Sequence, residues 1–294
     1  MAFINEHFML NNETGKHLYH DFAKDMPIYD YHCHLDPKQI SDNVACDNIT
    51  DLWLSGDHYK WRAMRAQGIE EQYITGDAAP LDKFKKWAET LENSVGNPLY
   101  HWSQLELKMY FDIEDLLTSD NAEAIYHRAN DYLKQHHTTT QSLITDSNVN
   151  LICTTDNPTD DLNYHDAIKA KDGFNTTVLP AFRPDDVFKV GDPAFTDLLQ
   201  KLENLTHPIT TPSDFIEALY KRIQYFHDKG GRLADHGLEE MHFEAYTDQA
   251  IQDIFKKALN HADISTYERF QFQSYMLNEL SKAYYERGWV MQIP

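Results

Sequence analysis

Short apolar segments that end in polar residues are the feature that most constrains the fold of this chain. Five segments are expected to form strands: residues 27–35, 149–156, 177–184, 231–237 and 289–293. Between the later segments, apolar residues recur with helical spacing, as in 214–229 and in 249–287, where a break is expected near Ile264-Ser265. Strands that alternate with helices indicate an α/β fold with a parallel sheet.

The polar residues at the ends of these segments indicate where a ligand binds. His32 and His34 lie in the polar end of the first segment, Asp156 ends the second, Arg183 lies at the end of the third, and Asp235 and His236 lie at the end of the fourth. In parallel α/β architectures, ligands bind at the carboxyl ends of the strands. The pattern therefore favours successive strands of a β/α barrel over scattered surface charges.

A long, mainly helical region separates the first two strands, from Ser41 to about Asn148. One helix begins at Asp51, is interrupted at Ser55-Gly56-Asp57 and resumes over 58–65, with Asp57 as the expected N-cap. Helical spacing recurs in 81–91, 99–110 and 122–134. Since no low-complexity linker marks a boundary, we interpret residues 41–148 as a helical insertion within a single domain that covers 1–294.

Charge and cysteine content exclude several classes of protein. Lys and Arg number 26 against 47 Asp and Glu, which gives a net charge of −21. So acidic a chain repels phosphate backbones, and an anionic substrate needs a locally placed cation. The three cysteines include no Cys-x-x-Cys pair, which indicates reduced thiols in the cytoplasm. Neither a signal peptide nor an apolar run of roughly 20 residues is present, so we expect no membrane partner.

His32 and His34 are the first candidate site residues. In a strand, residues two apart point to the same face, so the two imidazoles project together while Cys33 points the other way. Such a pair can hold a divalent metal. With 16 His in the chain, chance alone gives about one His-x-His. The alternative is that both histidines are satisfied by hydrogen bonds, with Cys33 as a small buried apolar residue.

Arg183 ends an otherwise apolar segment. A guanidinium at this position can bind a carboxylate through two parallel hydrogen bonds. The alternative is an internal ion pair with Asp185, Asp186 or a neighbouring strand.

His58, Tyr59 and Asp235 have weaker local signals. An imidazole and a phenol after the break at Gly56 suit a position over the barrel mouth, although ordinary helix packing is the alternative. Asp235 suits the orientation of a substrate hydroxyl, or a structural role. The sequence contains no glycine-rich dinucleotide or P-loop fingerprint and no Gly-x-Ser-x-Gly elbow.

Several motifs together resemble the uronate isomerase (glucuronate isomerase) family of amidohydrolase-like metal-dependent barrels. They occur in the same order along the whole chain: Tyr29 to Leu35, Leu52 to Arg65, Thr154 to Pro158, Pro180 to Asp185 and Leu233 to Gly237. The combination is specific, although no single motif is.

The resemblance implies a cytoplasmic aldose–ketose isomerase of hexuronate catabolism. It would interconvert D-glucuronate with D-fructuronate, and D-galacturonate with D-tagaturonate. By this similarity His32 and His34 bind one divalent metal, with zinc expected, and no organic cofactor is implied. His58 and Tyr59 lie at the substrate, Arg183 binds the uronate and Asp235 is a further catalytic residue. The partners implied are a small-molecule hexuronate and further copies of the chain in a homo-oligomer.

The sequence also departs from the family pattern. Family members continue beyond the last expected strand, so this chain corresponds to about five of the eight strands of a β/α barrel. An open parallel sheet leaves two edges, so we expect a truncated barrel with impaired activity. The alternatives are a metal-dependent hydrolase of the amidohydrolase type and a non-catalytic fragment.

Overall fold

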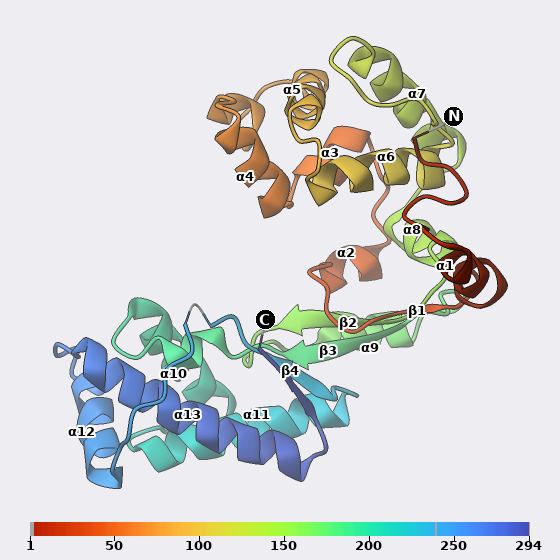
Figure 1. Cartoon of the computed structure of the whole chain (residues 1–294). Helices are drawn as coiled ribbons and strands as arrows, with labels where there is room; N and C mark the ends of the chain where they lie inside the picture. Colours follow the sequence, from red (N-terminus) through yellow and green to blue (C-terminus); the bar gives the residue numbers. More distant parts are fainter. Residues whose placement is uncertain (1–2, 239, 294) are drawn as a thin grey trace. The chain divides into compact units, whose positions relative to one another are not determined.

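The computed structural model describes residues 3–238 and 240–293. The chain folds into two compact units. One combines Met1–Pro27 with Asp42–Asn148, and the other combines Ile28–Ser41 with Val149–Pro294. The first unit is built almost entirely from helices and the second contains the sheet (Figure 1).

A five-stranded parallel sheet forms the centre of the second unit. Its strands are β1 (Ile28–Asp30), β2 (Val149–Asp156), β3 (Thr177–Phe182), β4 (Leu233–Asp235) and β5 (Val290–Gln292). They lie side by side in chain order, and each pair of neighbours is parallel. The strand direction changes between β2 and β5, so the sheet is curled (Figure 1). The expected α/β fold with a parallel sheet is confirmed.

Strand lengths agree with the sequence pattern best in the centre of the sheet. β2 has the predicted bounds, whereas β1 is much shorter than the predicted 27–35. The β1 prediction is wrong because the Asp30 Oδ1 accepts a hydrogen bond from the His32 backbone N–H at 3.3 Å, which turns the chain at the strand end. His32 and His34 therefore lie in the segment after the strand. Cys33 still donates its backbone N–H to the carbonyl of Cys153 at 3.1 Å.

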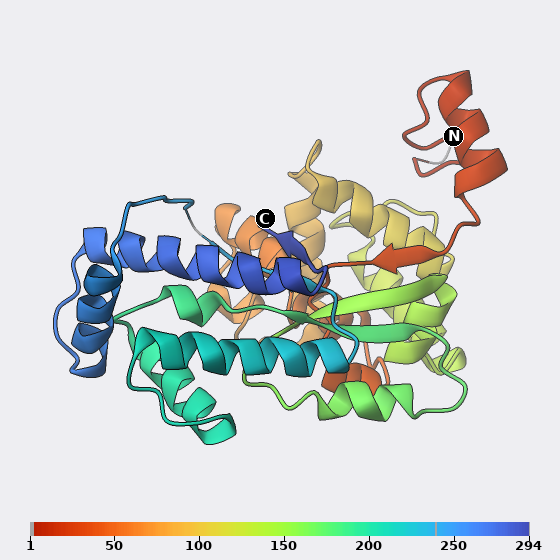
Figure 2. The ribbon, with the colours of Figure 1, turned by 90° about the horizontal axis from the view of Figure 1, so that it is seen from below.

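Helices of the second unit pack against the sheet or against one another. They are α2 (Pro37–Asp42), α9 (Asn163–Lys169), α10 (Pro193–Leu205), α11 (Pro212–Asp228), α12 (Asp248–Leu259) and α13 (Thr266–Glu286). α9 and α11 contact β3, and α13 contacts β5. Figure 2 shows α11 and α13 lying side by side. The predicted break at Ile264-Ser265 is confirmed, because Ser265 caps α13 in a capping box with Glu268.

Aromatic rings pack on one another in the core of the second unit. Phe182 at the end of β3 contacts the rings of Phe226 on α11 and Tyr284 on α13. Tyr284 in turn stacks on Trp289, with the ring planes 8° apart. All four are buried, and each contributes on the order of 2–3 kcal/mol of apolar burial. This core fixes the strands whose ends carry the candidate site.

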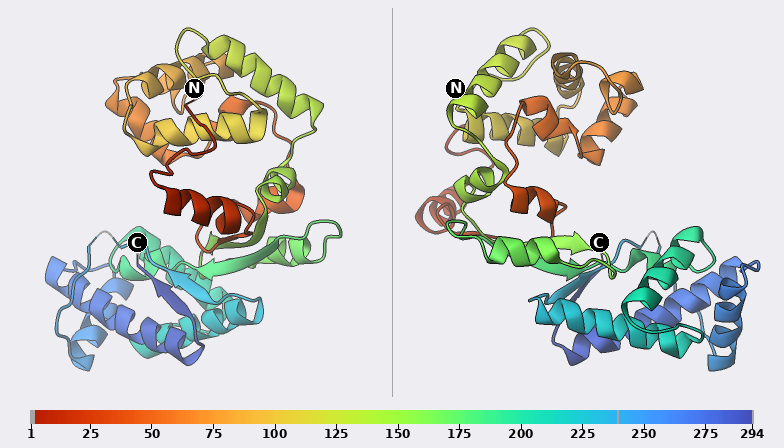
Figure 3. Two further views of the ribbon diagram at one scale, coloured as in Figure 1. Left: turned by 45° about the vertical axis from the view of Figure 1, so that its right-hand side comes forward. Right: turned by 180° about the vertical axis from the view of Figure 1, so that it is seen from behind.

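The helical unit has a separate core. Its elements are α1 (Glu13–Leu18), a π-helical turn (Tyr19–Ala23), α3 (Ile49–Leu54), α4 (His58–Ala66), a 3-10 turn (Glu71–Tyr73), α5 (Pro80–Glu92), α6 (Pro98–Phe111), α7 (Ala122–Gln135) and α8 (Thr140–Asp146). Two views in Figure 3 show α5, α6 and α7 gathered in this unit. Trp87 and Phe84 of α5 are fully buried there. The predicted N-cap is confirmed, since Asp57 accepts from the backbone N–H groups of Tyr59 and Lys60.

No helix in residues 3–238 and 240–293 has the length and apolar character that crossing a membrane requires.

Candidate functional site

Three residues from different strand ends meet at the carboxyl edge of the sheet. Asp235 ends β4 and is 1% exposed. Its Oδ2 lies 3.1 Å from Nη1 of Arg183, which directly follows β3. The same oxygen lies 3.7 Å from Nδ1 of His32, which follows β1. The sheet thus brings together three of the residues that the sequence analysis singled out.

Arg183 is held from a second side by Asp185. Its Nε donates to Asp185 Oδ2 at 2.9 Å, and Asp185 Oδ1 accepts the backbone N–H of Gly237 at 2.8 Å. The internal ion pair considered for Arg183 is therefore present, with Asp185 and with Asp235 on the neighbouring strand. Asp186 pairs with Lys189 instead, at 2.8 Å. The guanidinium is fixed in position before any ligand binds.

Gly237 is required at its position by close approach. A Cβ there would lie 2.7 Å from both Arg183 Nη2 and Asp185 Oδ2. These distances are shorter than van der Waals contact, so any side chain at residue 237 displaces the Arg183–Asp185 pair. The sequence offered no local sign of this constraint, because the three residues come from two separate segments.

His32 and His34 lie close together although the strand ends before them. Their ring centroids are 5.1 Å apart and their planes are perpendicular. His32 Nδ1 and both carboxylate oxygens of Asp235 are buried, and none has a hydrogen-bond partner in the described part of the chain. Buried polar atoms normally have partners. Here the Asp235 oxygen Oδ2 has ion-pair contacts with Arg183 and His32 instead of a hydrogen bond. Imidazole nitrogens and carboxylate oxygens are the donor types that bind zinc and similar divalent ions.

The His32 nitrogen and the Asp235 oxygens suit a divalent metal in their chemistry, but they come from only two residues. Within residues 3–238 and 240–293, no group of three or more His, Cys, Asp or Glu side chains is arranged to hold a metal ion. Burial raises the pKa of the Cys33 thiol to about 12, so the free thiol is protonated at neutral pH. Cys33 is half-buried rather than fully buried as expected.

A cavity of about 770 Å³ lies beside His34. Its lining comes from the segment after β1, the loop after β2, the start of α9 and the end of α10. Asp156 and His165 are among its lining residues, and both are almost completely buried. Asp156 was predicted as a strand end, whereas His165 and helix α10 were not predicted from the sequence. A histidine buried by tertiary packing leaves no local signal in the sequence.

Thr154 links Asp156 to His165. Its hydroxyl donates to Asp156 Oδ2 at 2.7 Å and lies 2.8 Å from Nε2 of His165. Because the hydroxyl proton points to the carboxylate, Nε2 is assigned as the donor to the Thr154 oxygen. Burial raises the pKa of Asp156 to about 7 and lowers the pKa of His165 to about 4. Burial disfavours the charged form of each group.

Helix α11 fixes the loop that follows β2. Arg222, which is 8% exposed, donates from Nε to the carbonyl of Pro158 and from Nη2 to that of Asp160, both at 2.6 Å. Its guanidinium lies 4.3 Å from the ring centroid of Tyr225, whose hydroxyl donates to the carbonyl of Asp161. These contacts of Arg222 and Tyr225 with the loop were not predicted from the sequence.

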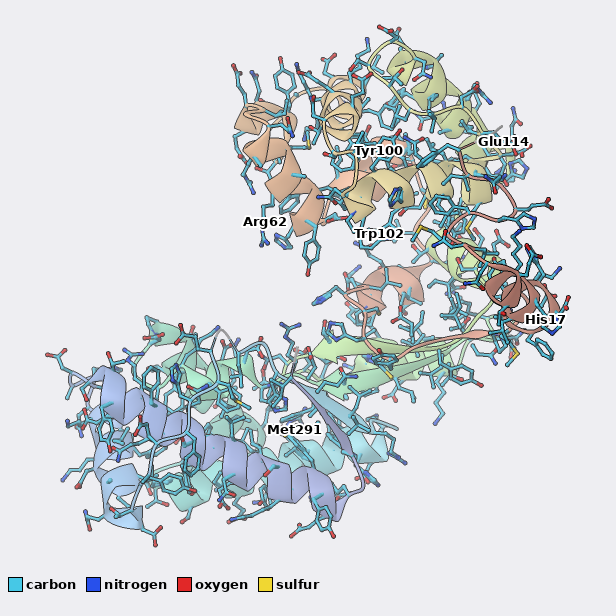
Figure 4. All side chains as sticks on the ribbon, viewed as in Figure 1. His17, Arg62, Tyr100, Trp102, Glu114 and Met291 are labelled. Atoms are coloured by element: carbon cyan, nitrogen blue, oxygen red, sulfur yellow. The ribbon has the colours of Figure 1, made fainter. Side chains whose placement is uncertain are left out.

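His236, the other polar residue at the end of β4, has a structural role. It is fully buried, with Nδ1 3.0 Å from the carbonyl of Gln292 and Nε2 3.2 Å from the hydroxyl of Tyr284. A carbonyl only accepts, so Nδ1 carries the proton and Tyr284 donates to Nε2. These bonds tie the end of β4 to β5. Met291 of β5, labelled in Figure 4, packs against the same core.

His58 and Tyr59 begin α4 in the helical unit. Tyr59 is 71% exposed, and its ring centroid lies 5.9 Å from the guanidinium of Arg62, labelled in Figure 4. The His58 ring contacts Trp61 at 4.7 Å between centroids. Lys60, on the buried side, pairs with the N-cap Asp57 at 2.7 Å. The helix start therefore presents a phenol and an imidazole to solvent from a fixed cap.

Comparison with known proteins identifies the family. The family model described as glucuronate isomerase matches residues 1–294. The chain belongs to the glucuronate isomerase family. It is 45% identical over 291 residues to the uronate isomerase of Oceanobacillus iheyensis, covering 99% of this chain and 62% of that protein. It is likewise 45% identical to the uronate isomerase of Bacillus subtilis, with the same coverage.

Solved structures of glucuronate isomerase family members share the fold. The crystal structure of uronate isomerase from Thermotoga maritima superposes with a TM-score of 0.93 at 30% identity, covering 100% of this chain and 64% of that one. Glucuronate isomerase from Caulobacter crescentus gives a TM-score of 0.84 at 26% identity, covering 92% and 58%. The chain thus spans about three fifths of the length of the relatives that it matches.

Proposed function

We propose that the protein is an aldose–ketose isomerase that interconverts D-glucuronate with D-fructuronate, and D-galacturonate with D-tagaturonate. The observation that carries this proposal is the meeting of His32, Arg183 and Asp235 at the carboxyl ends of three strands. Membership of the glucuronate isomerase family supports an isomerase over the metal-dependent hydrolase that the sequence left open.

We assign the fold to a (β/α)8-type barrel, of which the described sheet is five strands. In this assignment residues 41–148 form a helical insertion after the first strand of one domain. The order of parallel strands, β1 to β5 in sequence, is the order that a β/α barrel requires.

His32 and His34 would hold one divalent metal, with zinc expected. Their adjacent rings support this assignment, as does the buried Nδ1 of His32, which makes no hydrogen bond within the described residues. When bound, such an ion supplies Lewis-acid polarisation of the sugar carbonyl.

The remaining roles follow from charge and chemistry. Arg183 provides the cation that a carboxylate substrate needs in so acidic a protein, and its pairs with Asp185 and Asp235 hold it in one orientation. Isomerisation moves a proton between C1 and C2 of the sugar, which requires an acid and a base. We assign this proton transfer to Asp235, His58 and Tyr59. Tyr59 also contacts the substrate in this assignment.

Ketose formation tests the proposal. The zinc-supplemented 294-residue protein should convert D-glucuronate and D-galacturonate to their ketoses at a low rate, as expected for an open sheet with impaired activity. The product is detected by nuclear magnetic resonance (NMR) of its carbonyl carbon. His32→Ala and His34→Ala should abolish conversion and reduce zinc retention. Turnover that is unaffected by these two substitutions would remove the metal from the mechanism, and the absence of any ketose would overturn the proposal.

A further inference from the structure

The cavity beside His34 is an open depression of the sheet unit with buried polar residues in its lining. Its volume is about 770 Å³. Two of its lining residues, Asp156 and His165, are only 3% and 4% exposed, and both are held by Thr154. The Asp156 carboxylate is fixed further because Oδ2 also accepts the backbone N–H of Ala181 at 3.2 Å.

One wall of this cavity is rigid. Thr159, Asp160 and Asp161 line it from the loop after β2. Arg222 donates to the carbonyls of Pro158 and Asp160 in the same loop. These two hydrogen bonds preorganise the wall, and preorganisation reduces the entropy lost on ligand binding.

The negative charge of the cavity lining determines which chemical groups of a ligand can bind there. Four aspartates, including Asp156, Asp160 and Asp161, line the cavity together with one lysine, Lys201. Such a lining repels a carboxylate. Hydroxyl groups suit it, because they donate hydrogen bonds to carboxylate oxygens. Asp156 Oδ1 keeps acceptor capacity, since its separation from His165 Nε2 is 3.7 Å.

The cavity adjoins the candidate metal site through His34. That residue lines the cavity, and its ring lies 5.1 Å from the ring of His32, which contacts Asp235. We propose that the cavity receives the hydroxyl-bearing carbons of the sugar acid and that Asp156 accepts a hydrogen bond from one of these hydroxyls. This inference rests on the proposed function, and it makes Asp156 a specificity-determining residue that recognises hydroxyls rather than the carboxylate.

Ligand titrations followed by ¹H–¹⁵N NMR test this placement. D-Glucuronate and adipate have the same number of carbons, but adipate carries no hydroxyl. With zinc present, D-glucuronate should shift the backbone amides of Tyr164 and His165, and adipate should not. Asp156→Asn should weaken D-glucuronate binding at least about tenfold. The matched control is Asp197→Asn, an exposed aspartate on the smaller cavity of about 360 Å³, which should leave the affinity unchanged.

A second variant protects the test against misfolding of Asp156→Asn. Asn204 also lines the cavity but is exposed near the end of α10, so Asn204→Trp narrows the space without touching the buried network. It should weaken D-glucuronate binding while the melting temperature is kept. Glucuronate binding that is insensitive to both variants overturns this inference alone. A wild-type protein that neither binds glucuronate nor forms ketose overturns the proposed function as well.

Discussion

Arg183 Nη1 lies 3.1 Å from Oδ2 of Asp235, and this ion pair joins the ends of β3 and β4. Asp235 is 1% exposed, so its carboxylate depends on this guanidinium for compensation of its charge. Because Arg183 also binds Asp185, one side chain orients two carboxylates at the edge of the sheet. Three of the predictions below concern this edge or the loop beside it.

Removal of the guanidinium should destabilise the protein. Arg183→Met leaves Asp235 buried without a counter-charge, and we expect the free energy of unfolding to fall by about 2–4 kcal/mol. The matched control is Lys189→Met, which breaks the exposed pair with Asp186 and should cost about 0–1 kcal/mol. Urea unfolding measures both. Equal losses in the two variants would show that the Arg183–Asp235 pair is no more than a surface contact.

A methyl group at residue 237 should disturb the same pair. Gly237→Ala places a Cβ 2.7 Å from Arg183 Nη2 and Asp185 Oδ2, and we expect a loss of about 1–3 kcal/mol from overpacking. Gly56→Ala is the control, because a Cβ there meets nothing within 4 Å. Thermal unfolding compares them. A Gly237→Ala protein as stable as Gly56→Ala would contradict the close approach.

Arg222 on α11 should contribute more to the free energy of unfolding than an exposed arginine that makes similar hydrogen bonds. Arg222→Met leaves the carbonyls of Pro158 and Asp160 without their charged donor, at a cost of about 2–4 kcal/mol. Arg232 also donates to two carbonyls but is exposed, so Arg232→Met should cost under about 1 kcal/mol. Hydrogen exchange should accelerate in residues 157–161 of the first variant only. Unchanged hydrogen exchange in residues 157–161 would show that Arg222 does not stabilise this loop.

Asp156 and His165 should give opposite pH dependences of stability. The folded-state pKa of Asp156 is raised to about 7, so its contribution is present at low pH and is lost as the pH rises towards 7. The folded-state pKa of His165 is lowered to about 4, so its contribution is present above about pH 6.5 and is lost as the pH falls towards 4. In the wild-type protein, the two groups therefore change the free energy of unfolding in opposite directions between about pH 4 and pH 6.5.

Substitution of Asp156 or of His165 should therefore reveal the pH dependence of stability that the other residue causes. The unfolding free energy of Asp156→Asn should rise between pH 4 and 6.5 relative to the wild-type protein. That of His165→Gln should fall over the same range. Denaturant unfolding at several pH values measures both slopes. Parallel profiles for the two variants would show that burial does not separate the pKa values in these directions.

The centre of the sheet could be predicted from the sequence, and its edge could not. β2 is a long apolar segment between neighbours on both sides, so its pattern alone sets its bounds. β1 lies at the edge of the sheet, where the Asp30 side chain ends the strand through a hydrogen bond that apolar spacing does not reveal. The break before α13 was predictable because Ser265 and Glu268 form a local capping box.

Site residues divide in the same way. His32, Arg183 and Asp235 were found because each directly follows or ends an apolar segment. His165, Gly237 and Arg222 were missed, because their roles depend on contacts with residues far away in the chain: Thr154, Arg183 and Pro158. Local sequence patterns predict strand ends and helix caps, whereas buried hydrogen-bond networks and close approaches depend on the tertiary fold.

Solvent deuterium incorporation tests the central claim most directly. Isomerisation through proton transfer between C1 and C2 should exchange the C2 hydrogen of D-glucuronate with D₂O. With zinc present, the protein should incorporate deuterium at C1 of the ketose and, through the reverse reaction, at C2 of D-glucuronate, both detected by ²H NMR. His32→Ala should abolish this exchange, and Asp197→Asn should leave it unchanged. A protein that binds zinc through His32 and His34 yet incorporates no deuterium at either carbon would contradict the account.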